Sequence, residues 1–153
     1  SQFAYELSET FSLTLNEIKS EIRNTNHPIV WARYAERINT IEKMIVELKR
    51  VIKTQPIDVE EAKSLVDEIK DLLSYLASDS DNDCSNHNTA EKIIVFTNQY
   101  RSGFSEVGDV LKRAELHYQN GEFDLATDIT VEVLKKVHPQ AYEKYAESSK
   151  RGS

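Results

Sequence analysis

The stretch from Trp31 to Ile52 places an apolar residue three, then four, positions after the previous one without interruption. This alternation is a heptad seam, the pattern that packs one helix against another. At 1.5 Å per residue, a helix over residues 28–54 would be about 40 Å long. Because one helix cannot bury its own seam, the chain needs neighbouring helices of comparable length. The seam consists of Trp31, Tyr34, Ile38, Ile41, Ile45, Leu48 and Ile52.

Two flanking segments carry the same kind of stripe, one over residues 3–23 and one beginning at Asp58. Residues 24–28 and 55–57 separate the three segments, and Pro28 suits the first turn of a helix. Short connections make neighbouring helices antiparallel. Residues 1–78 are therefore predicted to form an antiparallel three-helix coiled coil of the spectrin-repeat type. The stripe residues are Phe3, Leu7, Phe11, Leu15, Ile18 and Ile22 in the first segment and Val59, Ala62, Val66, Ile69, Leu73 and Leu76 in the last.

The composition agrees with an all-α chain of few, long elements. Only 4 Gly and 3 Pro occur in 153 residues, which is too few for the many turns of an all-β fold. The one cysteine, Cys84, excludes an internal disulfide framework and favours a reducing compartment. No run approaches the roughly 20 apolar residues of a membrane span. The first residue is Ser1 rather than Met, which suggests a piece of a longer protein.

The middle third holds the excess negative charge, because residues 55–100 carry 10 Asp and Glu against 3 Lys and Arg. No cluster of basic residues is available to displace phosphate counterions, so nucleic acid is not an expected partner. Residues 78–88 contain no aliphatic side chain, and we predict an acidic flexible loop over 79–88. Asn88 with Glu91 is typical of a capping box and predicts a new helix over 89–101.

Residues 89–139 are predicted to form a C-terminal helical repeat, a short helix followed by a helical hairpin. Ser102 and Gly103 break the chain, Gly121 ends the next helix, and Pro139 ends the last. The hairpin has small and aromatic residues placed as in a tetratricopeptide repeat, but one hairpin is too few to form that receptor's groove. We expect it to close the bundle. The tail, 140–153, is expected to add a frayed helical turn or two and to be partly expression-derived.

No metal, cofactor or catalytic site is predicted. Asp79 to Asp83 resemble half of a calcium loop, yet Cys84 and Ala90 occupy the positions that need Gly and Glu. Cys84 and His87 have zinc-like spacing, but a structural site needs four ligands. Cys84 is expected to be a lone thiol in the polar loop, without the positioned base of a nucleophile. No phosphate loop or nucleophile elbow is present, so we expect no enzyme.

The second half of the chain carries a resemblance to a known family. The residues that carry it are 90–94, 96–102, 106–107, 111–114, 121–126 and 133–139, the last of which reads Val-Leu-Lys-Lys-Val-His-Pro. These residues resemble the C-terminal, cytoplasmic portion of EzrA, the septation ring formation regulator of Gram-positive bacteria. The clear likeness covers 89–139, about a third of the chain. The helices of residues 1–78 are similar to the family in type.

The resemblance implies a fold, a location and partners. EzrA proteins have one N-terminal membrane helix and a cytoplasmic array of spectrin-like repeats, and they act on the cytoplasmic side of the plasma membrane at the division septum. They bind the tubulin-like ring protein FtsZ, modulate the assembly and placement of its ring, and contact cell-wall synthesis proteins. This chain would lie at the membrane-distal end of that array. Self-association is also left open.

The resemblance also points to one candidate binding site, the polar run Asn98, Gln99, Tyr100 and Arg101. The family's patch reads approximately Gln, two residues, then Asn-Arg-Tyr-Arg-Ser. Asn98, Tyr100, Arg101 and Ser102 match it, whereas Val95 stands in place of Gln and Gln99 in place of Arg. The alternative is structural, with Tyr100 packed and Asn98 and Arg101 capping the break. Two alternative functions also stay open, a coiled-coil spacer and a tetratricopeptide-like peptide-binding module.

Overall fold

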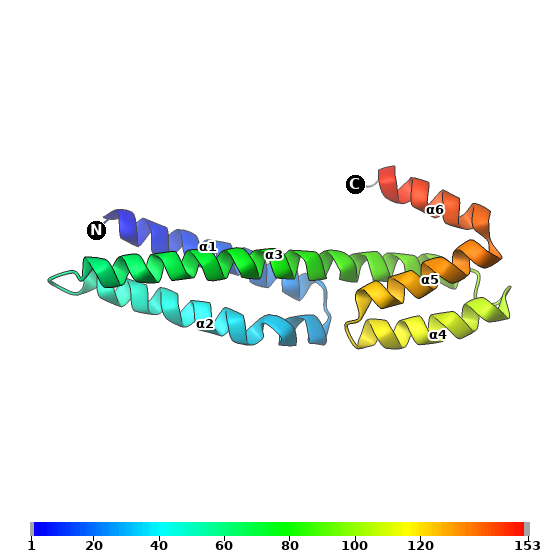
Figure 1. The fold of residues 1–153 in the computed structure, drawn as a ribbon, viewed down its shortest axis with the longest axis horizontal. Coiled ribbons are helices and arrows are strands. Elements are labelled where there is room, and N and C mark those ends of the chain that lie inside the picture. Colours follow the sequence, from blue (N-terminus) through cyan, green and yellow to red (C-terminus); the bar gives the residue numbers. More distant parts are fainter. Residues whose placement is uncertain (1, 152–153) are drawn as a thin grey trace. The chain divides into compact units, whose positions relative to one another are not determined.

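The computed structural model describes residues 2–151, and within that range every regular element is an α-helix (Figure 1). The predicted all-α class is therefore confirmed. The chain divides into two compact units, Ser1–Cys84 and Ser85–Ser153. The helix α3 (Val59–Asn98) contributes residues to both units. No helix of the described residues combines the length and the hydropathy that a membrane crossing demands.

Unit 1 consists of α1 (Gln2–Asn24), α2 (Pro28–Lys53) and the first part of α3. Ion pairs between neighbouring helices give their directions. On α1 and α2, Lys19 pairs with Glu42 at 3.2 Å and Glu9 pairs with Lys49 at 2.7 Å, so these helices are antiparallel. α2 and α3 are also antiparallel, because residue 33 pairs with 83 while residue 50 lies near 61.

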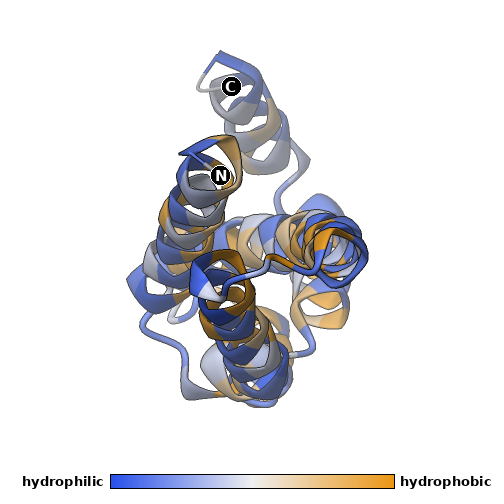
Figure 2. Cartoon of the chain, turned by 90° about the vertical axis from the view of Figure 1, so that its left-hand side faces the viewer, coloured by the Kyte–Doolittle hydropathy of each residue, from blue (hydrophilic) through white to orange (hydrophobic). Residues whose placement is uncertain are grey.

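The predicted seams form the core of unit 1. Figure 2 shows hydrophobic and hydrophilic residues alternating along the helices, as burial of one helix face requires. The ends of the stripes depart from the prediction, because Phe3 is 74% exposed and Val59 is 71% exposed. The buried seam residues are Phe11, Leu15, Ile18 and Ile22 of α1, Tyr34, Ile38, Ile41, Ile45, Leu48 and Ile52 of α2, and Ile69, Leu73 and Leu76 of α3.

Capping residues explain where two of these helices begin. The His27 Nδ1 atom accepts a hydrogen bond from the backbone N–H of Ile29 at 3.3 Å, and Pro28 occupies the first turn of α2. Asp58 accepts a hydrogen bond from the backbone N–H of Glu61 at 3.0 Å and so caps the start of α3.

The predicted loop over 79–88 and the predicted helix start at 89 are wrong. α3 continues without a break through this segment, so Asn88 and Glu91 lie in a helix interior rather than at a cap. The buried face of α3 keeps its three-and-four spacing here, but the side chains on it are small or polar. They are Ser80, Cys84, His87 and Ala90, each at most 2% exposed.

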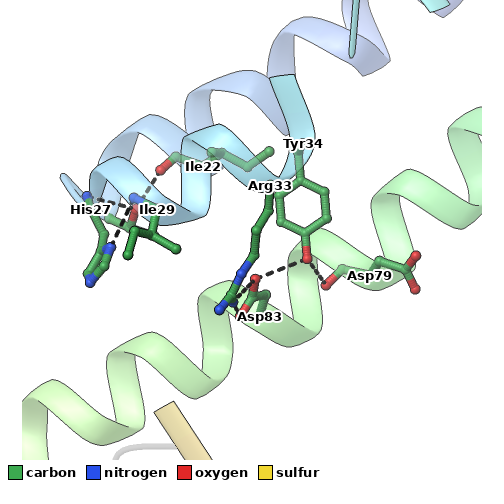
Figure 3. Close-up of polar contacts among 8 residues, drawn as sticks. Ile22, His27, Ile29, Arg33, Tyr34, Asp79 and Asp83 are labelled. Atoms are coloured by element: carbon green, nitrogen blue, oxygen red, sulfur yellow. Dashed lines mark hydrogen bonds and ion pairs between the residues drawn. The ribbon is translucent and has the colours of Figure 1, made fainter. Parts of the chain in front are cut away.

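Two of the three aspartates of this segment pair with α2, and this pairing supports a helix where a loop was predicted. Asp83 accepts two hydrogen bonds from the guanidinium of Arg33, at 2.8 and 2.9 Å, and one from the Tyr34 hydroxyl at 3.0 Å (Figure 3). Asp79 pairs with Arg37 at 3.0 Å. Asp79 and Asp83 therefore meet positive charge on the neighbouring helix.

Cys84 and His87 lie inside the protein rather than in an exposed loop. The Cys84 thiol lies 3.9 Å from the backbone carbonyl of Glu21 on α1, and burial raises the pKa of this thiol to about 11. His87 packs edge-on against Phe123, with ring centroids 5.2 Å apart. Both side chains act as core residues of their units.

Unit 2 consists of the end of α3 with α4 (Ser105–Gln119), α5 (Phe123–Val137) and α6 (Pro139–Arg151). α4 and α5 form the predicted hairpin. Gly121 takes a positive φ of 77° at its turn, which glycine adopts without strain. Val107, Val110, Leu111 and Val133 form the hairpin core, and Ile94 of α3 packs against it.

The tail is more ordered than predicted, because α6 is a helix of 13 residues. His138 accepts a hydrogen bond from the backbone N–H of Ala141 at 3.2 Å, and Pro139 occupies the first turn, the same arrangement as at α2. Ala141 packs with Ile93 of α3 and Leu134 of α5 in a second cluster. Gly152 and Ser153, the end of the predicted tail, lie outside the described residues.

Candidate functional site

The four predicted site residues lie at the turn that follows α3. Asn98 is the last residue of α3, and α4 begins at Ser105. Backbone hydrogen bonds shape the turn, with the Tyr100 N–H donating to the Thr97 carbonyl at 3.0 Å and the Arg101 N–H donating to the Asn98 carbonyl at 3.1 Å. The structure therefore keeps the four residues together, and it gives them different roles.

Arg101 lies across the turn and pairs with Glu115 of α4. Its Nη2 atom is 2.6 Å from one carboxylate oxygen of Glu115 and its Nη1 atom is 3.5 Å from the other. Nη1 also donates to the Asn98 side-chain carbonyl at 2.9 Å. The hydrogen bond to Glu115 raises the pKa of the Arg101 guanidinium above its ordinary value. A planar guanidinium held by two partners keeps one orientation.

Asn98 and Gln99 are exposed and present side-chain amides to solvent. The Asn98 carbonyl oxygen is occupied by Arg101, which directs the Asn98 amide N–H₂ group outward as a donor. The Gln99 Nε2 atom donates to the backbone carbonyl of Phe96 at 2.9 Å, which leaves the Gln99 oxygen as an acceptor. The turn thus offers a donor on Asn98 and an acceptor on Gln99.

Tyr100 is the inward member of the group. Its ring is half-buried and packs against both apolar clusters of unit 2. The ring centroid lies 5.0 Å from that of His138 and 6.0 Å from that of Phe96. The packing that sequence reasoning set out as the alternative is therefore present for Tyr100. Asn98 and Arg101 bind one another at the break while both remain accessible.

A polar network also joins α3 to the C-terminal end of α4. The Tyr118 hydroxyl is 2.8 Å from Nε2 of His87 and donates to the Glu91 carboxylate at 3.1 Å. Burial raises the pKa of Tyr118 to about 12. Among the described residues, no three His, Cys, Asp or Glu side chains are arranged to hold a metal ion.

Sequence reasoning did not identify Glu115, Tyr118 or Glu91 as partners in this region. Glu115 is 14 positions from Arg101, and only the antiparallel packing of α4 against the end of α3 brings the two together. The one available signal was the predicted break at Ser102 and Gly103, which implies that α4 folds back along α3. That signal gives a direction and no register.

Comparison with known proteins gives a family for nearly the whole chain. The model of the family described as "Septation ring formation regulator, EzrA" matches residues 2–149. The match extends well beyond the 89–139 segment that carries the likeness most clearly in the sequence. No solved structure matches the chain.

Curated relatives agree with the family match. The septation ring formation regulator EzrA of Staphylococcus aureus (strain N315) is 26% identical over 123 residues, which covers 80% of this chain and 22% of the relative. The protein of the same name from Bacillus subtilis (strain 168) is 24% identical over 131 residues, 86% of this chain and 23% of the relative. The chain thus spans about a fifth of the length of these relatives. With a family match from residue 2 to residue 149, this chain belongs to the EzrA family of septation ring formation regulators.

Proposed function

We propose that this chain is the part of a cell-division regulator that binds division proteins, the FtsZ ring among them, and modulates ring assembly and placement by protein–protein contact. Membership of the septation regulator family supports the division role. The turn at 98–101 supports the contact surface, because it combines two exposed amides with an arginine held in place by Glu115. The pre-ordered arginine is the observation on which this proposal rests most.

A protein surface is a better use of this turn than a small-molecule site. Asn98 and Gln99 are exposed at the end of α3, and Tyr100 packs inward against the hydrophobic clusters of unit 2. Arginine and tyrosine contribute strongly at protein interfaces. Because the guanidinium of Arg101 is already oriented, a partner carboxylate could bind it with little further loss of side-chain freedom. We therefore propose recognition rather than catalysis for this chain.

The proposed location is the cytoplasmic side of the plasma membrane at the division septum. The relatives are several times longer than this chain. We propose that contact with the membrane comes from an N-terminal helix outside residues 1–153, and that this chain contributes a binding surface at a distance from it. Other divisome and cell-wall synthesis proteins are proposed partners alongside FtsZ.

Co-sedimentation with FtsZ filaments tests the proposal. The chain should pellet with filaments, and Asn98→Ala with Gln99→Ala should reduce the bound fraction at least about fivefold, because interface energy concentrates in few residues. The matched control is Asn16→Ala with Asn39→Ala, two exposed amides of unit 1. Equal pelleting of both double variants would remove the site assignment, and no pelleting of the parent chain would remove FtsZ as its partner.

A second candidate function, a structural spacer, is favoured by α3, which runs for 40 residues and contributes to both units. A spacer would need length without a binding surface. In cells, a full-length regulator carrying Asn98→Ala and Gln99→Ala would then still localise at mid-cell. Loss of mid-cell localisation with an unchanged melting temperature supports the binding surface instead. The tetratricopeptide-like alternative would require a peptide bound to unit 2, which binding assays with division-protein peptides would reveal.

A further inference from the structure

The α3–α4 and α5–α6 connections lie at the same end of unit 2 (Figure 1). His138 is the single residue between α5 and α6. The centroid of its ring lies 5.0 Å from that of Tyr100 and 6.4 Å from that of Phe104, distances at which aromatic rings pack favourably. The Phe104 backbone N–H donates to the Tyr100 carbonyl at 3.2 Å and closes the turn that contains Arg101. One imidazole therefore packs against both residues that close this turn.

Hydrogen bonds fix the position of His138 at the start of α6. Its backbone N–H donates to the Leu134 carbonyl at 2.9 Å, and its own carbonyl accepts from the Ala141 N–H at 3.1 Å. The ring nitrogen Nδ1 also accepts from the Ala141 N–H, at 3.2 Å. Because this nitrogen is an acceptor, the imidazole has one orientation at the cap. The same residue therefore begins α6 and presents a fixed ring to the turn.

α6 buries little of its surface against the rest of unit 2. Of its described residues, Ala141 alone is buried. A hollow of about 310 Å³ lies between α6 and helices α3 and α5, with Ile93, Val131 and Tyr142 in its lining. His138 itself is half-buried. A substitution at His138 can therefore alter the turn without removing a large side chain from the hydrophobic core.

We propose that His138 is a positioning residue for the proposed binding turn, and that docking of α6 through this ring regulates the binding surface. The ring keeps Tyr100 packed inward, and this orientation leaves the amides of the turn exposed and Arg101 paired with Glu115. When the ring is absent, Tyr100 and Phe104 each lose an aromatic neighbour, and the hydrogen bond between them opens more often. The effect on binding rests on the proposed function, whereas the effect on the turn rests on the geometry of unit 2 alone.

Two substitutions separate the ring of His138 from its cap. His138→Asn keeps a side-chain acceptor for the start of α6 and removes the ring, whereas His138→Phe keeps a ring and removes the acceptor. Native-state hydrogen exchange of the whole chain, without a partner, measures the backbone amides of Phe104 and Tyr142. In His138→Asn the Phe104 amide should exchange at least about fivefold faster than in the parent chain, because two aromatic pairs are lost. In His138→Phe it should stay within about twofold of the parent, while the Tyr142 amide of α6 exchanges faster.

His27 supplies a matched control, because it makes the same kind of cap at α2 in unit 1, with Nδ1 accepting from the Ile29 N–H at 3.3 Å. His27→Asn should leave the Phe104 amide unchanged. The amide of Leu111, in the hairpin core, reports on the folding of unit 2 as a whole and should also be unchanged in His138→Asn. An unchanged Phe104 amide in His138→Asn would overturn the proposal. Equal acceleration at Phe104 and Leu111, or equal effects of His138→Asn and His138→Phe on the Phe104 amide, would overturn it as well.

A double substitution keeps the test independent of a general loss of stability. Phe104→Leu removes one of the two ring contacts of His138 and keeps an apolar side chain. His138→Asn combined with Phe104→Leu should accelerate the exchange of the Arg101 amide by less than the product of the two single effects, since the two residues share one contact. An effect equal to the full product would show that the two residues act separately and would contradict the proposal.

Co-sedimentation with FtsZ filaments then relates the turn to binding. His138→Asn should reduce the bound fraction and His138→Phe should restore it, in parallel with the exchange of the Phe104 amide. If exchange changes as expected while His138→Asn binds as the parent does, His138 positions the turn but the turn is not the binding surface, which contradicts the proposed function. If neither exchange nor binding changes, the positioning role of His138 is excluded.

Discussion

The guanidinium of Arg101 lies 2.6 Å from the carboxylate of Glu115, across the turn that joins α3 to α4. One ion pair therefore connects the proposed binding turn to the helix that packs beneath it. Arg101→Ala would remove both a local ion pair and a proposed recognition group. This substitution alone therefore does not separate a structural role of Arg101 from a binding role. Exchanging the two charges separates these roles.

We predict that Arg101→Glu combined with Glu115→Arg restores the melting temperature that either single change lowers, yet does not restore binding to FtsZ filaments. The ion pair survives the exchange, whereas the arginine no longer lies on the turn. Thermal melts and co-sedimentation of the parent, the two single variants and the double variant provide the measurements. Full recovery of binding in the double variant would show that Arg101 acts only by holding the turn.

The continuity of α3 can be tested at Asn82, an exposed residue within the segment where sequence analysis predicts a loop. Asn82→Pro should cost about 3 kcal/mol, because proline removes a helix hydrogen bond and clashes with the preceding turn. Asn82→Ala is the control and should leave stability unchanged or slightly raised. Urea denaturation measures both. A proline variant as stable as the parent would mean that residues 79–88 are not helical in solution.

The reason the loop prediction failed lies in which residues are buried. The aliphatic seam stops at Leu76 and resumes with Ala90 and Ile93, and between them Ser80, Cys84 and His87 take the buried positions. A prediction based on aliphatic residues alone therefore assigns residues 79–88 to a solvent-exposed loop. Two sequence signals pointed to a helix, namely the absence of Gly and Pro and the preserved spacing of the three residues. The pairing of Asp83 with Arg33 depends on helix register, which no local pattern reveals.

The rest of the fold followed from the sequence where the buried residues are aliphatic. The long helices of unit 1 and the hairpin of unit 2 were predicted from their stripes and from Pro28, Gly121 and Pro139. The site was predicted only through a family likeness. The distinct roles of its members, an inward Tyr100 and an Arg101 bound to Glu115, depend on tertiary packing and appear only in the structure.

The core of unit 1 offers a matched pair of substitutions on α2. Ile41 is 1% exposed and Val46 is 67% exposed. Ile41→Asp should cost about 3–5 kcal/mol, because it places an unpaired charge in the seam. Val46→Asp should change stability little. Chemical denaturation monitored by circular dichroism measures the stability of both variants. Similar losses for the two variants would contradict the assigned face of α2.

Glu21 on α1 should limit stability at neutral pH. Burial, and next the neighbouring carboxylate of Asp81, raise the pKa of Glu21 above its ordinary value of 4.5. A carboxyl whose pKa is raised by folding favours the folded state at low pH, and this contribution is lost as pH rises through the folded value. Glu21→Gln should therefore raise the melting temperature at pH 7 and have little effect at pH 4. Glu36→Gln, an exposed carboxylate on α2, is the control, and an equal gain from it would contradict the argument.

Cys84 should make the protein sensitive to alkali. Burial is the main cause that raises the pKa of its thiol from an ordinary value of 9.0 to about 11, and the nearby Glu21 adds to the shift. Between these two values the unfolded chain releases the thiol proton while the folded chain retains it, so the free energy of unfolding falls as pH rises. Urea denaturation at intervals from pH 8 to pH 11 should show this fall, and Cys84→Ala should show a shallower one. The two slopes must be compared rather than the absolute stabilities, because the alanine variant also loses packing.

In the folded parent chain at pH 8, a thiol reagent should label Cys84 far more slowly than it labels the urea-unfolded chain. Rapid labelling without urea would place the thiol at the surface and remove the basis for the alkaline effect.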